Sequence, residues 1–533
     1  MEALSSLVAL LVVALTALWW LVVSRRLRVD RAALEQVQHN GQRILRPVST
    51  LPLLGNALDL ARHLRDIHDW VYELLRASHG EPVLLQIPGR PDVVFVGKVE
   101  HFEQAFGSRF DAFIKGPFAF DTTRDFLGNG IFAVDHADWV HQRKTASHLF
   151  TARTIRDALT DTVRRHVVTL HRILQRSQEN NERIDLFKLF NRFTIETFTE
   201  IAFGLSLECL ESDREHPFQT AFDSGQRMLA RRFLGPTWVW KLQRVLNIGN
   251  ERQMRADLQV INDMVYDIIQ QSLARRQRQE STKTDEQQPR AKDIVSLFLD
   301  NMHNTPDGVS QEVEAFEPAF LRDVVVNFLV AGRDTTAQAL SWFFVCIARH
   351  PDVVAKIRDE IDACLSDRKT DDTPFTPEQV QQLVYLEAAL RETLRLYPPV
   401  PLNPKQLAKD VVMSDGLYLR EGSTVTLHSY ALGRLEHVWG ADATAFRPER
   451  WIDPDTKQLR SFSPFKFIAF HAGPRSCLGK NLALLEMKIV LATLLSAWDL
   501  AVQDADQVSY DFSLTFPIKG ALLARPQRRP ASD

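Results

Sequence analysis

The pattern of apolar and polar positions is helical over most of the chain, from about residue 100 to residue 395, where few prolines interrupt the runs. The longest run covers residues 319–350, between Pro318 and Pro351, and contains no proline. If continuous, this helix would span about 48 Å. Because it is apolar almost all round, we expect it to run through the middle of the fold.

Short β-rich runs lie on either side of this helical part. Residues 82–87 and 92–96 flank a Pro-Gly turn and predict a hairpin. Residues 411–427 read as short strands split by Gly416 and Gly422. We therefore predict a mainly α fold with small β-sheets.

The N-terminal segment has a different pattern, because residues 3–23 form a run without a charge that is long enough to cross about 30 Å of hydrocarbon. Arg25, Arg26 and Arg28 follow, which places the C-terminal bulk in the cytoplasm by the positive-inside bias. A cleaved secretory signal is the alternative, but the positive charges follow the run and no small-residue cleavage site is evident. We predict an uncleaved transmembrane anchor.

The segment after this anchor predicts a polar, helical connector that ends where Pro47, Pro52 and Gly55 break any continuing helix. No Gly/Ser linker, repeat or low-complexity tract divides the sequence beyond it. The charged stretch at residues 274–293 reads as a solvated loop between two helices. The predicted organisation is therefore an anchor over residues 1–28, a connector or hinge over 29–55, and one large domain over 56–533.

Composition narrows the function classes. The 533 residues carry a formal net charge of -3, which gives no global electrostatic reason to bind nucleic acid. Cys209, Cys346, Cys364 and Cys477 stand far apart without a C-x-x-C pair, which argues against a disulfide framework or a cysteine-rich zinc site. A reducing compartment fits this usage.

Polar residues interrupt the long apolar helix at "AGRDTT". Gly332 costs about 1 kcal/mol relative to alanine in a helix, and Asp334 places an acid in apolar surroundings. Gly332 could simply admit a neighbouring helix, Thr335 could bond back to the carbonyl of Ala331, and Asp334 could be salt-bridged. Together, a gap, an acid and two hydroxyls also suit a small polar ligand beside a proton relay.

Two further patterns carry charge at helical spacing. Glu392 and Arg395 lie on one helix face at i, i+3, and Arg450 in "FRPERW" is a candidate third partner. Trp139 and Arg143 in "WVHQR" are i, i+4 neighbours that could bind one carboxylate or phosphate. The alternative for Trp139 and Arg143 is structural: the indole ring packs in the core, and the arginine buries its aliphatic part while its charge reaches solvent.

The stretch "FHAGPRSCLG" surrounds Cys477 with the turn-forming residues Gly473, Pro474 and Gly479, just before a helix predicted over residues 481–498. Amide groups and the dipole at a helix N-terminus favour a thiolate. Arg475 adds a positive charge. Alternatively, a lone cysteine acts as a small buried hydrophobic residue, and we interpret Cys209, Cys346 and Cys364 in this way.

These segments resemble a known family. "FHAGPRSCLG" is similar to the F-x-x-G-x-R-x-C-x-G signature of the haem-thiolate cytochromes P-450. "AGRDTT", "ETLR" and "FRPERW" resemble the family's oxygen-activation, E-x-x-R and P-E-R-F elements in the expected order, and "WVHQR" resembles its W-x-x-x-R element. Trp451 occupies the position of the phenylalanine in the family's P-E-R-F element. The resemblance covers essentially the whole chain, including a microsomal-type anchor.

The resemblance implies a haem b cofactor with Cys477 as the axial thiolate ligand of its iron. Phe470 would pack near this ligand, and Gly473 and Gly479 would let backbone amides approach the sulfur. The haem propionates would be held by four donors: Trp139, Arg143, Arg475 and Lys405.

The same resemblance assigns roles on the long helix. Asp334 and Thr335 would deliver protons to dioxygen in a groove opened at Gly332, and Ala331 would face the substrate. Glu392, Arg395 and Arg450 would form a structural triad that supports the cysteine loop.

The implied activity is monooxygenation in the endoplasmic reticulum membrane, with the catalytic domain facing the cytosol. Further stretches, such as "LGNGIFAVDHADWVHQRKTAS", resemble the plant and fungal fatty-acid or alkane ω-hydroxylases. The sequence after Cys477 is short for a flavin or nicotinamide domain, so we expect electrons from NADPH through a separate reductase. Alternatives are another lipid hydroxylase, a lipid-hydroperoxide isomerase or dehydratase, and a haem- or lipid-binding sensor.

Overall fold

The computed structural model describes residues 32–150, 160–212, 215–281, 294–302, 318–364 and 373–530. The chain divides into two compact units that alternate along the sequence. Unit 1 takes Met1–Ile114, Leu234–Leu242 and Leu402–Ala443, and unit 2 takes Lys115–Phe233, Gln243–Pro401 and Thr444–Asp533. The predicted anchor at residues 3–23 lies outside the described residues. Within the described ranges, no helix combines the length and the apolar character that a membrane span requires.

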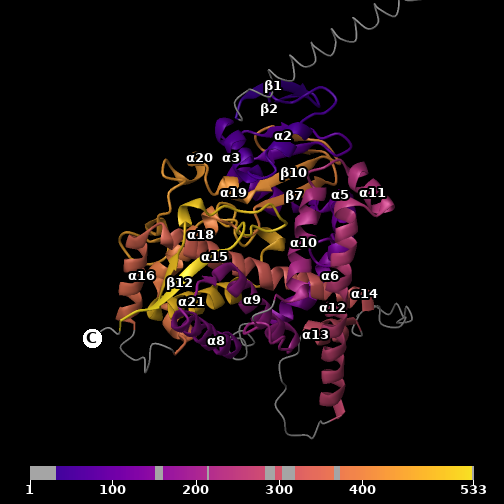
Figure 1. Ribbon diagram of the computed structural model, residues 1–533. Coiled ribbons are helices and arrows are strands. Elements are labelled where there is room, and N and C mark those ends of the chain that lie inside the picture. The colour runs from indigo at the N-terminus through magenta and orange to yellow at the C-terminus, as the bar shows by residue number, and fades with distance from the viewer. Residues whose placement is uncertain are drawn as a thin grey trace, which may run out of the picture. The chain divides into compact units, whose positions relative to one another are not determined.

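A seven-stranded sheet forms the framework of unit 1, with strand order β1-β2-β3-β4-β10-β7-β5 (Figure 1). The predicted hairpin is confirmed, since β3 and β4 pair antiparallel. The predicted strands within 411–427 are confirmed as β8, β9 and the start of β10. The elements of unit 1 are β1 (Leu34–His39), β2 (Gln42–Pro47), α2 (Ala57–Arg62), α3 (Ile67–Ala77), β3 (Val83–Leu85), β4 (Val93–Val96), α4 (Val99–Glu103), η1 (Gln104–Ser108), η2 (Phe110–Ala112), β5 (Phe113–Ile114), β7 (Leu402–Leu407), β8 (Val411–Val412), β9 (Tyr418–Leu419), β10 (Thr424–His428), α19 (Ser429–Leu432) and α20 (Glu436–Trp439).

The predicted helical connector before residue 55 was wrong, because β1 and β2 form an antiparallel hairpin there. Its two turn residues, Asn40 and Gly41, have φ of 47° and 78°. Two positive φ values are what a two-residue hairpin turn needs, and Asn-Gly is the dipeptide that adopts them most readily. The sequence "HNGQ" therefore indicates this hairpin. Its turn residues determine the local structure more strongly than the polar composition of the segment does.

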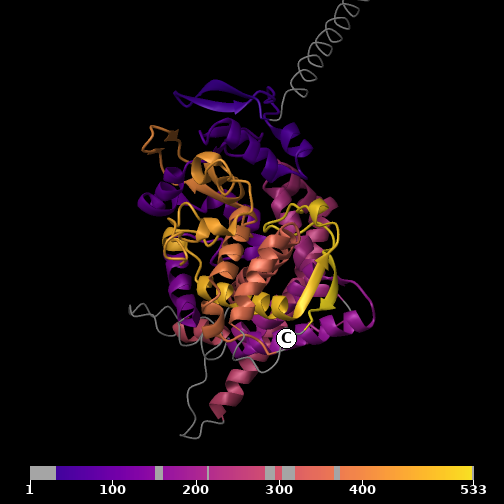
Figure 2. The ribbon, with the colours of Figure 1, turned by 90° about the vertical axis from the view of Figure 1, so that its left-hand side faces the viewer.

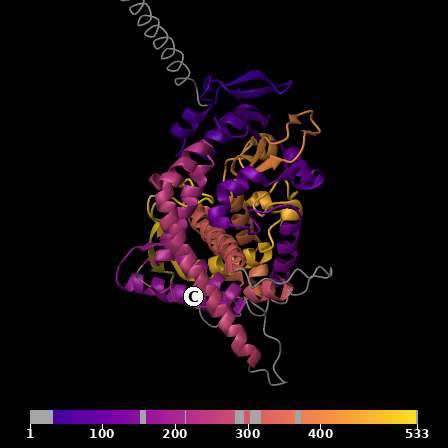
Figure 3. The same ribbon diagram turned by 90° about the vertical axis from the view of Figure 1, so that its right-hand side faces the viewer.

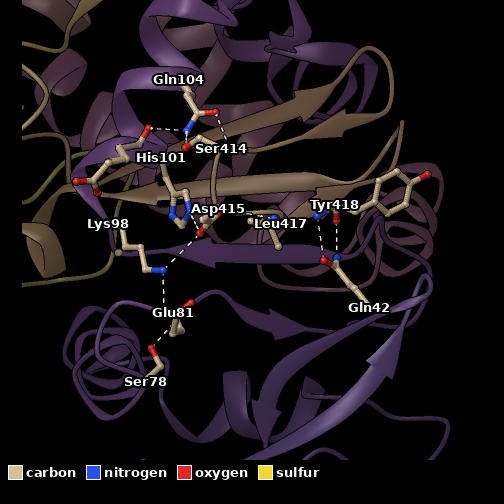
Figure 4. Close-up of polar contacts among 12 residues, drawn as sticks. Gln42, Ser78, Glu81, Lys98, His101, Gln104, Ser414, Asp415, Leu417 and Tyr418 are labelled. Carbon is tan, nitrogen blue, oxygen red and sulfur yellow. Dashed lines mark hydrogen bonds and ion pairs between the residues drawn. The ribbon is translucent and has the colours of Figure 1, made fainter.

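Side chains fix the β8–β9 turn within unit 1 (Figure 4). The buried His101 places Nε2 2.8 Å from the Asp415 carboxylate, which Lys98 also approaches. Gln104 accepts a hydrogen bond from the Ser414 amide and donates one to its hydroxyl. A short two-stranded sheet cannot be stable alone, so these contacts account for its order.

Unit 2 contains most of the helices and a three-stranded sheet of order β11-β12-β6 (Figures 1 and 2). Its elements are α5 (Gly116–Leu127), α6 (His136–Ser147), η3 (His148–Phe150), α8 (Thr160–Glu179), β6 (Ile184–Asp185), α9 (Leu186–Phe203), α10 (Pro217–Arg232), α12 (Gly249–Ser281), α13 (Ile294–Met302), α14 (Pro318–Leu329), η5 (Val330–Asp334), α15 (Thr335–Ala348), α16 (Pro351–Ala363), α17 (Pro377–Gln381), α18 (Val384–Leu396), η6 (Pro448–Trp451), η7 (Gly473–Arg475), α21 (Lys480–Ala497), β11 (Trp498–Val502), η8 (Ala505–Gln507) and β12 (Leu523–Arg528), while α11 (Thr237–Leu246) has residues in both units.

The predicted long helix is confirmed between Pro318 and Ala348, as α14, η5 and α15 in direct succession. Its middle, η5, is a π-helical turn, in which the helix widens by one residue. α15 packs against α9, α18 and α21, and nearly all of its side chains are buried. The apolar pattern of this run thus reflects a central position within unit 2.

The surface loop predicted over residues 274–293 was wrong in its first part, because α12 continues to Ser281. Figure 3 shows α12 as a long helix that runs beside α10, and the two are in extensive contact. Charged residues in this stretch therefore belong to a helix, while residues 282–293 lie outside the described chain.

Candidate active site

The loop before α21 positions Cys477. Gly473 has a φ of 64°, which favours glycine, and it begins the turn η7. The Cys477 amide donates to the Phe470 carbonyl at 2.9 Å, so the loop closes on itself. The Gly479 amide donates a hydrogen bond to the cysteine sulfur. A Cβ on Gly479 would make only ordinary contacts, so conformation at Gly473 is the stricter requirement.

Cys477 is the exposed cysteine of the described chain, whereas Cys209 and Cys346 are buried and Cys364 is half-buried. Surrounding protein atoms nevertheless dehydrate the sulfur, and this dehydration is the main reason that its pKa is raised. The Gly479 amide and the charges of Arg143 and Lys480 act in the opposite direction and are the smaller causes.

The amide and the cationic groups thus favour the thiolate, as predicted, but burial outweighs them and the net pKa of Cys477 is raised. A bound cation would reverse that direction, because a thiol that coordinates a metal ion is deprotonated.

Two guanidinium groups gather around one indole ring near this loop. The Arg475 and Arg143 carbons Cζ lie 4.5 Å and 5.8 Å from the centroid of the buried Trp139 ring. Arg143 donates to the Ser476 carbonyl at 2.8 Å, and its charge lowers the pKa of Cys477. The structure thus brings Trp139 and Arg143 of α6 together with Arg475 and the cysteine, from segments far apart in the sequence.

Lys405, the fourth predicted propionate donor, is a residue of unit 1. It lies in β7 of unit 1, where it is buried and its Nζ is 5.7 Å from the Phe106 ring centroid. Its predicted role as a propionate donor stays a prediction.

The π-helical turn holds the acid and the alcohol differently. Asp334 is buried, accepts hydrogen bonds from Gln226 of α10 at 2.8 Å and from Arg333 at 2.7 Å, and burial raises its pKa to about 6. The half-buried Thr335 donates to the Ala331 carbonyl at 2.7 Å. The salt bridge expected as an alternative for Asp334 and the backbone hydrogen bond expected as an alternative for Thr335 are therefore both present. A carboxyl group with a pKa near neutrality can also exchange a proton at physiological pH.

Gly332 admits a neighbouring helix. A Cβ at this position would lie 2.1 Å from the Phe198 ring of α9, so the missing side chain is replaced by a packed ring. The groove that we expected Gly332 to open is filled at its Cβ position.

Glu392 is the centre of a buried polar cluster. Arg395 donates to both of its carboxylate oxygens at 2.8 and 2.6 Å, and Arg450 Nε lies 3.3 Å from one of them. The Trp451 indole N–H donates to the same carboxylate at 2.9 Å, and the Arg447 amide donates at 3.0 Å. Trp451 thus adds a hydrogen bond that phenylalanine could not supply.

Sequence reasoning did not assign roles to Gln226, Arg333 or Trp451. Gln226 follows a helical pattern without any motif, and its partner Asp334 lies more than one hundred residues away. Arg333 lies in "AGRDTT" beside Asp334, and Trp451 lies in "FRPERW" beside Arg450. Their positions next to predicted site residues could therefore have indicated a role for both.

The residues present fit an iron porphyrin. The exposed Cys477 receives an amide N–H at its sulfur, the Arg143 charge acts on that sulfur, and Arg475 lies over the nearby Trp139 ring. Cationic side chains suit the acidic substituents of such a cofactor. Fold and site together are those of a mainly helical protein with an exposed cysteine suited to ligate a metal-containing cofactor.

Comparisons with known proteins identify the family. The Cytochrome P450 family model matches residues 45–525, and the chain belongs to this family. It is 34% identical to Cytochrome P450 86B1 of Arabidopsis thaliana over 90% of this chain and 86% of that protein. It is likewise 34% identical to Alkane hydroxylase MAH1 of Arabidopsis thaliana (91% and 94% covered) and to Cytochrome P450 CYP94D108 of Paris polyphylla (89% and 91% covered). The protein is a cytochrome P450 monooxygenase.

Replacing Glu392 by Gln should lower the free energy of unfolding by about 3–5 kcal/mol, because two buried guanidinium groups lose their counter-charge. Trp451→Phe, which removes one donor and keeps the charges, should cost about 1 kcal/mol for the hydrogen bond. Urea unfolding measures both. Equal losses in the two variants would contradict the central role of the Glu392 charge.

Proposed function

We propose that this protein hydroxylates long-chain fatty acids at or near the ω carbon, using O2 and electrons from NADPH delivered by a separate flavoprotein reductase. The observation that carries the haem-thiolate part is the exposed Cys477, whose sulfur receives an amide hydrogen bond and lies within the influence of the Arg143 charge. When bound, haem supplies activation of dioxygen for insertion of one oxygen atom into a C–H bond.

The residues of this chain divide the remaining work. Cys477 would hold the iron, and the Gly479 amide would tune the basicity of its sulfur. Trp139, Arg143 and Arg475 would hold the propionates. The Glu392 cluster keeps the fold around the cysteine loop in place.

Proton handling falls to the π-helical turn. The buried carboxyl of Asp334 has a pKa of about 6, so both of its protonation states are accessible near neutral pH. The Thr335 hydroxyl, bonded to the Ala331 carbonyl, is a second proton carrier on the same turn. Ala331, which is half-buried, is proposed to face the substrate.

The substrate class rests on two lines of support. The chain shares stretches with plant and fungal ω-hydroxylases, and one relative is named for alkane hydroxylation. An alkane or another lipid is therefore the nearest alternative substrate. A hydroperoxide isomerase or dehydratase, or a sensor, would have no use for Asp334 and Thr335 as proton carriers.

The proposed location is the endoplasmic reticulum membrane. Residues 3–23 supply an apolar run of spanning length, followed by arginines that favour a cytosolic catalytic domain. The proposed boundaries are an anchor at 1–28, a connector at 29–55 and the catalytic domain at 56–533.

Long-chain fatty acids should shift the Soret band of the full-length enzyme and, with a flavoprotein reductase present, should stimulate NADPH consumption and yield ω-hydroxylated product by mass spectrometry. Alkanes and fatty alcohols of equal length serve as comparison ligands. A stronger response to alkanes would replace the substrate assignment, and a reconstituted enzyme that consumes no NADPH with any lipid would overturn the monooxygenase proposal.

Thr335→Ala should uncouple electron flow from hydroxylation, with a larger share of NADPH ending in hydrogen peroxide, because one proton carrier is lost. Ser341→Ala is a matched control, since its buried hydroxyl also donates to the carbonyl four residues earlier, Ala337, at 2.7 Å. The ratio of product to NADPH consumed measures coupling. If both variants couple as the wild type does, Thr335 has no proton role.

A further inference from the structure

Asp135 stands at the N-cap of α6, yet its carboxylate serves other segments. Aspartate at this position usually accepts hydrogen bonds from amides of the first helical turn. Among the described residues, the Asp135 side chain makes no such bond to α6. Its oxygens instead accept hydrogen bonds from the amides of Lys115 at 3.0 Å and Gly116 at 2.9 Å, and from Arg475 at 2.6 Å.

The two amides belong to the start of α5. Gly116 has a φ of 77°, a conformation that favours glycine and turns the successive N–H groups of residues 115 and 116 toward one carboxylate. One oxygen serves Lys115 and the other Gly116, so the carboxylate spans the turn. The position of α5 is thereby tied to the residue that begins α6.

The third donor comes from the cysteine loop. Arg475 lies two positions before Cys477, and its Nη2 donates both to Asp135 and to the Val134 carbonyl, at 2.9 Å. This pair of contacts fixes the guanidinium over the Trp139 ring. Loss of the Asp135 charge would remove the carboxylate partner of this arginine, while its contacts with the Val134 carbonyl and the ring face would remain.

The local charge favours an additional anion. Burial, together with the positive charge of Arg475, lowers the pKa of Lys115 to about 8, while Asp135 acts against that shift. Arg143 adds a further cation beside the Trp139 ring. Three cationic side chains therefore gather near one carboxylate, and this concentration of positive charge favours an acidic group such as a propionate.

We propose that Asp135 is a positioning residue for the cofactor: it orients Arg475 toward a haem propionate and joins that arginine to the start of α5. The proposal rests on the haem site proposed above. Asp135 itself need not touch the cofactor, since it acts through Arg475.

Asp135→Asn keeps an oxygen that can accept an amide hydrogen bond but removes the charge that holds Arg475. Loss of such a supporting partner typically weakens binding of a metal group by about 10–100-fold. We expect haem to transfer from the full-length holoenzyme to apomyoglobin about tenfold faster than from the wild type. Asp138→Asn is the matched control, because Asp138 is exposed on the first turn of the same helix.

A double-variant cycle shows whether the effect passes through Arg475. Arg475→Ala alone should accelerate haem transfer, and adding Asp135→Asn to it should change the rate by less than about twofold, since residues that act as one unit are not additive. Full additivity would overturn the proposal, as would equal rates for Asp135→Asn and Asp138→Asn.

Asp135→Glu supplies a second test if the amide variant does not fold. It keeps the charge but displaces the oxygens, so its transfer rate should exceed the wild-type rate by a smaller factor, and a wild-type rate would overturn the proposal. A wild-type protein that binds no haem would instead overturn the proposed function.

Discussion

The dehydration of one sulfur atom is the constraint on which this site depends. Protein atoms surround Cys477 closely enough to raise its pKa, and the amide and cationic groups nearby do not offset that cost. A thiol in such a place gains by binding a cation, which stabilises the deprotonated form directly. Burial therefore opposes a free thiolate at Cys477, and a bound cation would offset that cost.

Other polar residues of unit 2 also have several partners each. Glu392 collects two arginines, an indole and an amide in a region from which solvent is excluded, so its charge is neutralised by several donors at once. Asp135 does the same on a smaller scale for Arg475 and the start of α5. On the long helix, the acid is held by Gln226 and Arg333, and the Gly332 position is packed by Phe198. In each case a buried charge or a missing side chain is matched by partners from other segments, which fix its position.

The sequence predicted elements whose signals are local. The long apolar helix between its prolines, the β3–β4 hairpin and the cysteine loop all follow from short-range pattern or motif. The β1–β2 hairpin was missed although Asn40 and Gly41 signal it, because polar composition was given more weight than turn chemistry. Gln226 and Asp135 could not be predicted, since their partners are distant in the sequence and only tertiary packing brings them together. The net pKa direction of Cys477 was also out of reach, because dehydration depends on the whole surrounding fold.

The central claim, that Cys477 presents its thiolate to haem iron, is tested most directly by the absorption spectrum of the reduced, carbon monoxide-bound protein. The account predicts a red-shifted Soret band in the wild type and in Cys346→Ala, whose cysteine is buried in α15, and loss of that band in Cys477→Ala. A red-shifted band that persists without Cys477 would contradict the account.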